Sequence, residues 1–392
     1  MSQEETEAIL LKAPGDRCSC KPKGKGLGTL LNPFFFRIVM RFSLANTLNT
    51  LALYLPPALV SPKALSHVRD NVRWLPAVLT DRIYLETRLG LGETAVDLIF
   101  DTSATGYKVL AGRNPVISFP APLSRSDAWT RIQDLYRAFS DASTVLGTYG
   151  SKIWLEFDIE TRPQALPTPG VFVGLKPLNK LGLDAQDRLG KTSLYTHFAH
   201  DVLKYLRAEP LPRRVQDQLH VCCAALPESA QLSYAGFMLA RPHHAIRLCI
   251  TRLPVGAMFD YLEDIGWPDA EKGFRATLAR LAETETMVLL HVDVWDTVKP
   301  RTGMEFFFER RPQLVGCFED DGLLDQLVAM ELCTPEKRDA LLTWPGSTAL
   351  PFPHLFWPTV LQRRVNHVKL VWTPEAVTAK AYLFAVINAR VL

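Results

Sequence analysis

The sequence lacks the features that assign many proteins of this length to a class. It has only 7 cysteines in 392 residues, and no two of them have the Cys-x-x-Cys spacing. Neither a zinc site nor a disulfide framework is therefore indicated, and we expect reduced thiols in a cytoplasmic protein. The net charge of +3 is too small to argue for a nucleic-acid or membrane-surface ligand.

Targeting signals and long uninterrupted apolar runs are also missing. The N-terminus is acidic and has no signal-peptide layout. Residues 30–60 are rich in apolar side chains, but Arg37, Arg41 and the Pro56-Pro57 pair interrupt them. A membrane-spanning helix needs about 20 mostly apolar residues, so we expect a buried or amphipathic helix here instead.

The chain does have a recurring pattern of two alternating strands followed by a helical stretch. About five copies are visible, from residues 83–89 and 96–100 to residues 367–372 and 380–384. Ten strands in consecutive hairpins make an antiparallel meander, and closing it removes the exposed edges. The predicted fold is α+β, a ten-stranded antiparallel β-barrel of ααββ repeats with the helices outside. We divide the chain into a flexible leader (1–28), a helical segment packing on the barrel (29–80) and the barrel domain (81–392).

One face of most predicted strands is polar, and in a closed barrel this face would line the lumen. The five cations predicted to point inward are Arg88, Lys152, Arg247, Lys369 and Lys380. The acids on the same face are Glu86, Asp97, Glu156, Asp293 and Glu305. Buried charges need a partner or a ligand. The acids could pair some of the cations, and an anionic ligand such as a diphosphate could take the rest.

The same face carries aromatic side chains that would form the walls of a chamber, and two imidazoles that are candidates for proton transfer. They are Tyr84, Trp154, Trp295, Phe307, Tyr382, His291 and His367. Aromatic faces stabilise cations by about 0.5–2 kcal/mol per contact. Such a chamber could ionise an allylic diphosphate, shield the carbocation and let Glu86 accept the proton that an attacking nucleophile loses. The alternative is that the polar face is the solvated side of an ordinary open sheet.

This barrel, with a lumen of Lys, Arg and Tyr, resembles the ABBA prenyltransferases over about residues 80–390. That family places a Glu on an early strand as the base, a form that Glu86 matches in Tyr84-Leu-Glu-Thr-Arg88. It holds diphosphate with Arg and Lys-x-Tyr motifs, and Lys380-Ala-Tyr382 fits that form. The resemblance implies that Glu86 is the base. It implies that the diphosphate is bound by Arg88, Lys152, Arg247, Lys369, Lys380 and Tyr382. The substrate-binding residues that it implies are Tyr84, Trp154, His291, Trp295, Glu305 and Phe307.

The implied activity is transfer of an isoprenyl group to an aromatic small molecule or a peptide side chain, as in natural-product tailoring. Its partners would be dimethylallyl or geranyl diphosphate and the acceptor, with no nucleic acid and no membrane span. No protein metal site and no firm cofactor is expected, and Mg²⁺ is left open. Two other hypotheses stand beside this one. The acid-rich lumen favours a non-catalytic barrel that binds a peptide or small ligand. Residues 185–192 fit a relaxed phosphate-loop pattern, which would make Lys191 part of a nucleotide-dependent enzyme.

Overall fold

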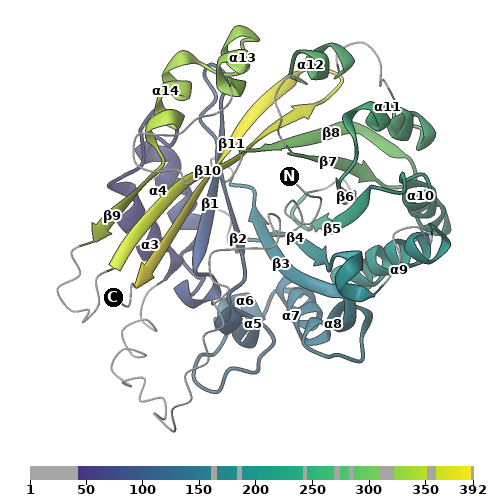
Figure 1. Ribbon diagram of the computed structural model, residues 1–392. Helices are drawn as coiled ribbons and strands as arrows, with labels where there is room; N and C mark the ends of the chain where they lie inside the picture. Colours follow the sequence, from purple (N-terminus) through teal and green to yellow (C-terminus); the bar gives the residue numbers. More distant parts are fainter. Residues whose placement is uncertain are drawn as a thin grey trace, which may run out of the picture.

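Ten strands of the chain close into a barrel, which Figure 1 shows end-on. The computed structural model describes residues 43–159, 166–182, 188–241, 245–268, 274–281, 287–308, 322–350 and 359–389, so the predicted leader at 1–28 lies outside them. The barrel strands are β1 (Arg82–Arg88), β2 (Val96–Asp101), β3 (Gly150–Phe157), β4 (Gly170–Leu175), β5 (Gln231–Met238), β6 (Ile246–Thr251), β7 (Met287–Val294), β8 (Val298–Phe307), β10 (Thr359–Trp372) and β11 (Val377–Ala389).

The ring closes through antiparallel pairs only. Neighbouring strands follow the chain from β1 to β8, then β8 pairs with β10, β10 with β11, and β11 with β1. Every backbone edge of the ring is therefore covered by a neighbour, which is the reason that meanders of this length close. This barrel, with helices on its outside, confirms the fold class predicted from the sequence.

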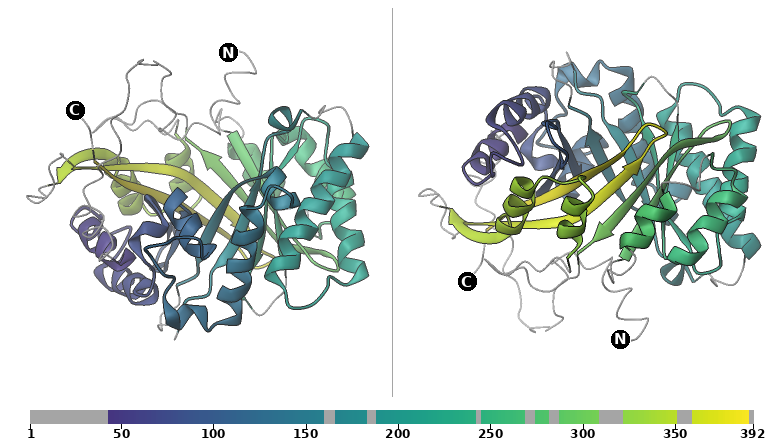
Figure 2. Two further views of the ribbon diagram at one scale, coloured as in Figure 1. Left: turned by 90° about the horizontal axis from the view of Figure 1, so that it is seen from below. Right: turned by 90° about the horizontal axis from the view of Figure 1, so that it is seen from above.

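An eleventh strand, β9 (Gly346–Leu350), was not predicted and lies outside the ring. It pairs with Thr359–Arg363 of β10, whereas β8 pairs with His367–Trp372 further along the same strand. The outer parts of β10 and β11 continue past the ring, and with β9 they form a three-stranded extension at one end of the barrel (Figure 2).

Helices surround the barrel between its hairpins (Figure 1). They are α3 (Leu44–Ala52), α4 (Pro62–Val72), η1 (Ala77–Leu79), α5 (Ala104–Leu110), α6 (Ala121–Ser124), α7 (Asp127–Phe139), α8 (Val145–Tyr149), η2 (Leu178–Leu181), α9 (Arg188–Leu206), α10 (Arg213–Ala224), α11 (Val255–Asp264), α12 (Phe274–Leu281), α13 (Leu323–Ala329) and α14 (Pro335–Thr343). Among the helices that the structure describes, none combines the length and the apolar character that crossing a bilayer requires.

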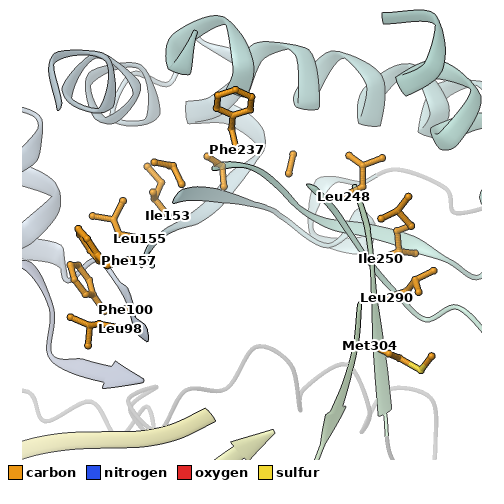
Figure 3. Packing of buried hydrophobic residues seen from close by; sticks show 14 of the residues in the cluster. Leu98, Phe100, Ile153, Leu155, Phe157, Phe237, Leu248, Ile250, Leu290 and Met304 are labelled. Atoms are coloured by element: carbon orange, nitrogen blue, oxygen red, sulfur yellow. The ribbon is translucent and has the colours of Figure 1, made fainter. Parts of the chain in front are cut away.

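The main hydrophobic core lies between the barrel and this helical layer. Strand side chains alternate, so one half of each strand points outward into the core and the other half into the lumen. Figure 3 shows Leu155, Phe237 and Leu248 on the side of the strands that faces the helices, and all three are buried. The same alternation places the polar half of each strand inside the ring.

The segment before β1 packs on the outside of the barrel. Ser61 caps α4 by accepting a hydrogen bond from the Ala64 amide, and Pro62 follows at the first helical position. The Thr87 hydroxyl of β1 donates to the Leu59 carbonyl, which ties this segment to the first barrel strand. The division of the chain into three parts stays a prediction.

A buried lysine anchors the first hairpin to α14. Lys337 lies in the first turn of this helix, after the cap Thr334, and its ammonium donates to the carbonyls of Arg88, Gly90 and Glu93 at 2.7–2.9 Å. Three carbonyl acceptors replace the hydration that the ammonium loses on burial. The turn that follows Glu86 and Arg88 is thus held in place from outside the barrel.

Candidate active site in the barrel lumen

The carboxylate of Glu86 lies inside the barrel at the centre of a hydrogen-bonded group. Lys380 Nζ donates to Glu86 Oε1 at 2.5 Å, and the Tyr382 hydroxyl, on the residue directly opposite, donates to Oε2. Arg88 Nη1 lies 3.6 Å from Oε1. Burial acts to raise the pKa of Glu86, but Lys380, Arg88 and Lys369 outweigh it and hold the pKa well below its usual value. Glu86 is therefore ionised and, while Lys380 holds it, a weak base.

A second carboxyl group lies beside Glu86. Asp97, opposite Glu86 on β2, accepts from the Ile159 amide at 2.8 Å and lies 2.7 Å from Arg88 Nη1. Burial raises the pKa of Asp97, and the negative charge of the neighbouring Glu86 carboxylate raises it further, to about 7. This acid and Glu86 are thus tuned in opposite directions, as the acid and base of many active sites are.

A bidentate ion pair spans β6 and β7 on the far side of the lumen. Arg247 Nε and Nη2 donate to the two carboxylate oxygens of Asp293 at 2.7 and 2.8 Å. Burial favours the neutral acid, yet Arg247 outweighs it and lowers the pKa of Asp293 to about 2. The guanidinium predicted to bind a ligand is therefore already paired in this conformation.

The third charged group surrounds Glu305 on β8. His291 Nε2 lies 2.8 Å from Glu305 Oε1, Lys369 Nζ at 3.3 Å and His367 Nε2 at 3.6 Å. Burial is the main cause that lowers the pKa of both His291 and His367 to about 4. The positive charge of Lys369 contributes to the lowered pKa of His291. Both imidazoles are neutral near pH 7, so Lys369 supplies the positive charge at this point.

Arg301 and Lys152 form no ion pair with any residue that the structure describes. Arg301 of β8 lies beside Arg247. Burial is the main cause that lowers the pKa of Arg301, and the positive charge of Arg247 lowers it further. Lys152 of β3 instead lies over the Trp154 ring, with Nζ 4.8 Å from the ring centroid. Each of them keeps its charge available to a ligand.

Arg247, Arg301 and Lys369 line one small space together with His291 and Asp293. Its volume is about 10 Å³, about what one water molecule requires. At this point long charged side chains reach across the lumen and pair with one another. A ligand larger than water must displace some of them.

Aromatic side chains lie on the lumenal side of several strands. Tyr84 packs edge-on against Trp154 and Phe384, with ring centroids 5.2 Å apart in both pairs. His367 stacks on Tyr382 at 3.8 Å and lies 4.8 Å from Phe307. These faces could stabilise a cation, as Phe384 does for the Arg364 guanidinium at 4.7 Å.

A glycine makes room for one further ring. Gly236 of β5 pairs with Phe172 of β4, and a Cβ atom added at Gly236 would lie 2.2 Å from the Phe172 ring. Only glycine allows the ring to lie across the neighbouring strand at this position. Phe172 in turn belongs to a lumenal apolar cluster with Met238, Cys249 and Leu289.

The structure brings all but one of the predicted site residues together. The residues that it places in the lumen or at its wall are Tyr84, Glu86, Arg88, Lys152, Trp154, Arg247, His291, Glu305, Phe307, Lys369, Lys380 and Tyr382. The prediction for Trp295 is wrong. Strand β7 ends at Val294, so the alternation does not extend to Trp295, whose ring packs against the outer core under the Arg207 guanidinium of the helical layer.

Other lumenal groups were missed by the sequence analysis. Arg301 was missed because β8 already begins at Val298 and so includes Pro300 and Arg301. Arg241, predicted to lie in a turn, forms a bidentate pair with Asp158 at 2.7 and 2.8 Å. The only signal for either was the positive charge next to a predicted strand end.

Lys191 does not have the environment of a phosphate-loop lysine. It is buried, and its ammonium donates to the carbonyls of Pro227 and Glu228 at 3.1 and 2.9 Å. The hypothesis of a nucleotide site at Lys191 is therefore wrong. Within the described parts of the chain, no group of three or more His, Cys, Asp or Glu residues is arranged to hold a metal ion.

Comparison with known proteins gives two similar solved structures. AnaPT from Neosartorya fischeri has a TM-score of 0.47 and 12% identity, with 91% of each chain covered. The apo form of the prenyltransferase PriB has a TM-score of 0.44 and 12% identity, and the match covers 87% of this chain and 93% of that one. No family model matches this chain, and no curated protein matches it. The description of the fold rests on the strand pairing of the chain itself.

Proposed function

We propose that the protein transfers an allylic isoprenyl group from its diphosphate to an aromatic small molecule or a peptide side chain. The observation that supports this most strongly is the meeting of Arg247, Arg301 and Lys369 around one lumenal space, with no described carboxylate paired to Arg301. One guanidinium group can bind two phosphate oxygens at once, and a lysine ammonium adds a compact positive charge. We assign the diphosphate to this group.

Binding of the diphosphate would also activate the base. In the unliganded barrel Lys380 holds Glu86, and the ion pair keeps the carboxylate weakly basic. A diphosphate carries more negative charge than one carboxylate, so it competes for Lys380 and for Arg88. When Lys380 turns to the diphosphate, the pKa of Glu86 rises towards the range that suits a general base.

The chemical step then follows from charge placement. The bond between the allylic carbon and the diphosphate oxygen breaks, and the cations stabilise the leaving group. The carbocation lies against Tyr84, Trp154 and Phe384, whose ring faces are electron-rich. The acceptor attacks the allylic carbon and loses a proton to Glu86.

The experiment is a product assay. The purified chain is incubated with dimethylallyl or geranyl diphosphate and a panel of indoles, phenols and tyrosine- or tryptophan-containing peptides, with and without Mg²⁺. Mass spectrometry should detect an acceptor heavier by one isoprenyl unit, together with released diphosphate. If neither a prenylated acceptor nor diphosphate release is found with either donor, the transferase proposal is wrong.

A second candidate is a non-catalytic barrel that binds a peptide or small ligand. The pairing of Glu86 with Lys380, Asp293 with Arg247 and Glu305 with Lys369 favours it, because these carboxylates neutralise most of the cations in advance. This candidate requires that isoprenyl thio-diphosphates do not bind in the lumen. The transferase proposal requires that they do.

A further inference from the structure

A cleft on the outside of the helical layer shares no residue with the lumen. It lies between α7 and the end of α9, which pack against each other outside the barrel (Figure 1). Its volume is about 600 Å³, within the ~300–1,000 Å³ of ordinary ligand pockets. The lumenal space at Arg301 is far smaller, so the larger described hollow is the outer one.

The lining of this cleft is strongly basic. Its cations are Arg113, Arg131, Arg137, Lys204 and Arg207, and its carboxylates are Asp134 and Asp141. The lining therefore has a net charge of +3, equal to the formal charge of the whole 392-residue chain. Cations gathered around a concave surface raise the local potential and attract anions.

Both carboxylates are already engaged. Asp134 pairs with Arg137 one turn along α7. Asp141 accepts from the amide and the hydroxyl of Ser143, at 2.9 and 2.8 Å, and these hydrogen bonds lower its pKa. The remaining cations form no ion pair with a described carboxylate, although Asp201 acts on Lys204, Glu209 on Arg207 and Asp141 on Arg113 at longer range.

Three of the remaining cations are either partly buried or in contact with an aromatic ring. Arg131 Nε is buried and has no hydrogen-bond partner among the described residues. The Arg207 guanidinium lies 4.7 Å from the centroid of the Trp295 ring, and Lys204 Nζ lies 5.5 Å from that of Tyr205. A buried guanidinium nitrogen without an acceptor is unfavourable unless a ligand supplies one.

We infer that this cleft binds a small polyphosphate, an anion with at least two linked phosphate groups. Arg131 and Lys204 line the cleft from the two helices, and Arg113 and Arg207 line it from the segments beside them. A guanidinium can bind two oxygens of one phosphate at the same time. The half-buried Tyr205 also lines the cleft, so an aromatic side chain is present beside the cations. The inference does not depend on the proposed transferase activity.

The test is calorimetric titration of the full chain with inorganic tripolyphosphate and, separately, with ATP, both without added metal. The double variant Arg131→Gln/Lys204→Gln should bind about tenfold more weakly or worse, because two charge-assisted contacts are lost. The matched control is Arg213→Gln, which removes an exposed cation on α10 outside the cleft. A second control, Arg301→Gln, removes the lumenal cation.

Saturable binding that the double variant loses and that both controls keep supports the inference. Equal affinity for the two probes assigns recognition to phosphate alone, and tighter binding of ATP adds a contact with the base; both outcomes support the site. Three results would overturn it: no saturable binding at millimolar probe, the same loss in Arg213→Gln as in the double variant, or loss in Arg301→Gln alone.

Discussion

Lys380 and Glu86 form an ion pair across β11 and β1 at 2.5 Å, and the Tyr382 hydroxyl shares the same carboxylate. This pair joins the residue predicted to be a base to a residue predicted to bind diphosphate. Each therefore controls the other: the base is weak while the lysine holds it, and the lysine is available to a ligand only when it leaves the carboxylate.

Glu86→Gln should separate binding from chemistry. Loss of a positioned general base typically lowers turnover by about 10²–10⁴-fold. Binding of geranyl thio-diphosphate should be as tight as in the wild type or tighter, because Lys380 no longer pairs with a carboxylate. Single-turnover product formation and calorimetry measure the two effects. Glu93→Gln, in the exposed turn of the same hairpin, is the control, and unchanged turnover in Glu86→Gln would remove it from the mechanism.

The Arg247–Asp293 pair should behave as a buried ion pair in a double-mutant cycle. Arg247→Met leaves Asp293 charged in the lumen, which should cost about 3–5 kcal/mol of unfolding free energy. Arg247→Met/Asp293→Leu removes both charges and should cost less than either single change. Urea unfolding measures the cycle. Arg213→Met breaks the exposed Arg213–Asp217 pair and should cost no more than about 1 kcal/mol. Additive losses from the two lumen changes would show that the pair is not coupled.

Stability should depend on pH through His291 and His367. The pKa of each is about 4 in the folded protein, against an ordinary value of 6.5. Between pH 4 and 6.5 the unfolded chain binds more protons than the folded protein. The free energy of unfolding therefore rises as the pH rises through this window, and it decreases as the pH falls from 6.5 to 4. Each imidazole should contribute on the order of 3 kcal/mol across this window. His367→Gln should flatten the dependence in urea unfolding at a series of pH values, whereas His220→Gln, exposed on α10, should not.

Asp97 should act in the opposite direction over an overlapping range. Its pKa of about 7 lies above the ordinary 3.8, so the folded protein keeps a proton that the unfolded chain releases. This lowers stability as pH rises from about 4 to 7. Asp97→Asn should therefore make the rise of stability with pH steeper than in the wild type. A flatter curve for this variant would contradict the assigned direction.

The alternation of side chains made much of the lumen predictable. Tyr84, Glu86 and Arg88 point inward because β1 is regular, and the same reasoning placed His367 and Lys369 correctly on β10. It failed where strands end or shift register. Trp295 lies just past the end of β7, and Arg301 lies where the pairing of β7 with β8 shifts near Val292 and Val294.

The pairing of charges inside the barrel could not be predicted in the same way. The sequence indicates that Arg247 and Asp293 face inward, but their contact depends on β6 lying beside β7 in one register. Lys380 reaches Glu86 only because β11 closes the ring against β1. The occupation of this part of the lumen by paired side chains follows from these long-range strand pairings. A strand count alone describes the width of a barrel and not what occupies it.

The measurement that tests the central claim most directly is calorimetric titration of the wild type and Arg301→Gln with dimethylallyl and geranyl thio-diphosphates, with and without magnesium. The account predicts saturable binding to the wild type and binding about tenfold weaker in Arg301→Gln, with the fold intact, because Arg301 is in no described ion pair. No binding to the wild type under any of these conditions, or equal binding to both proteins, would contradict a diphosphate site in the lumen.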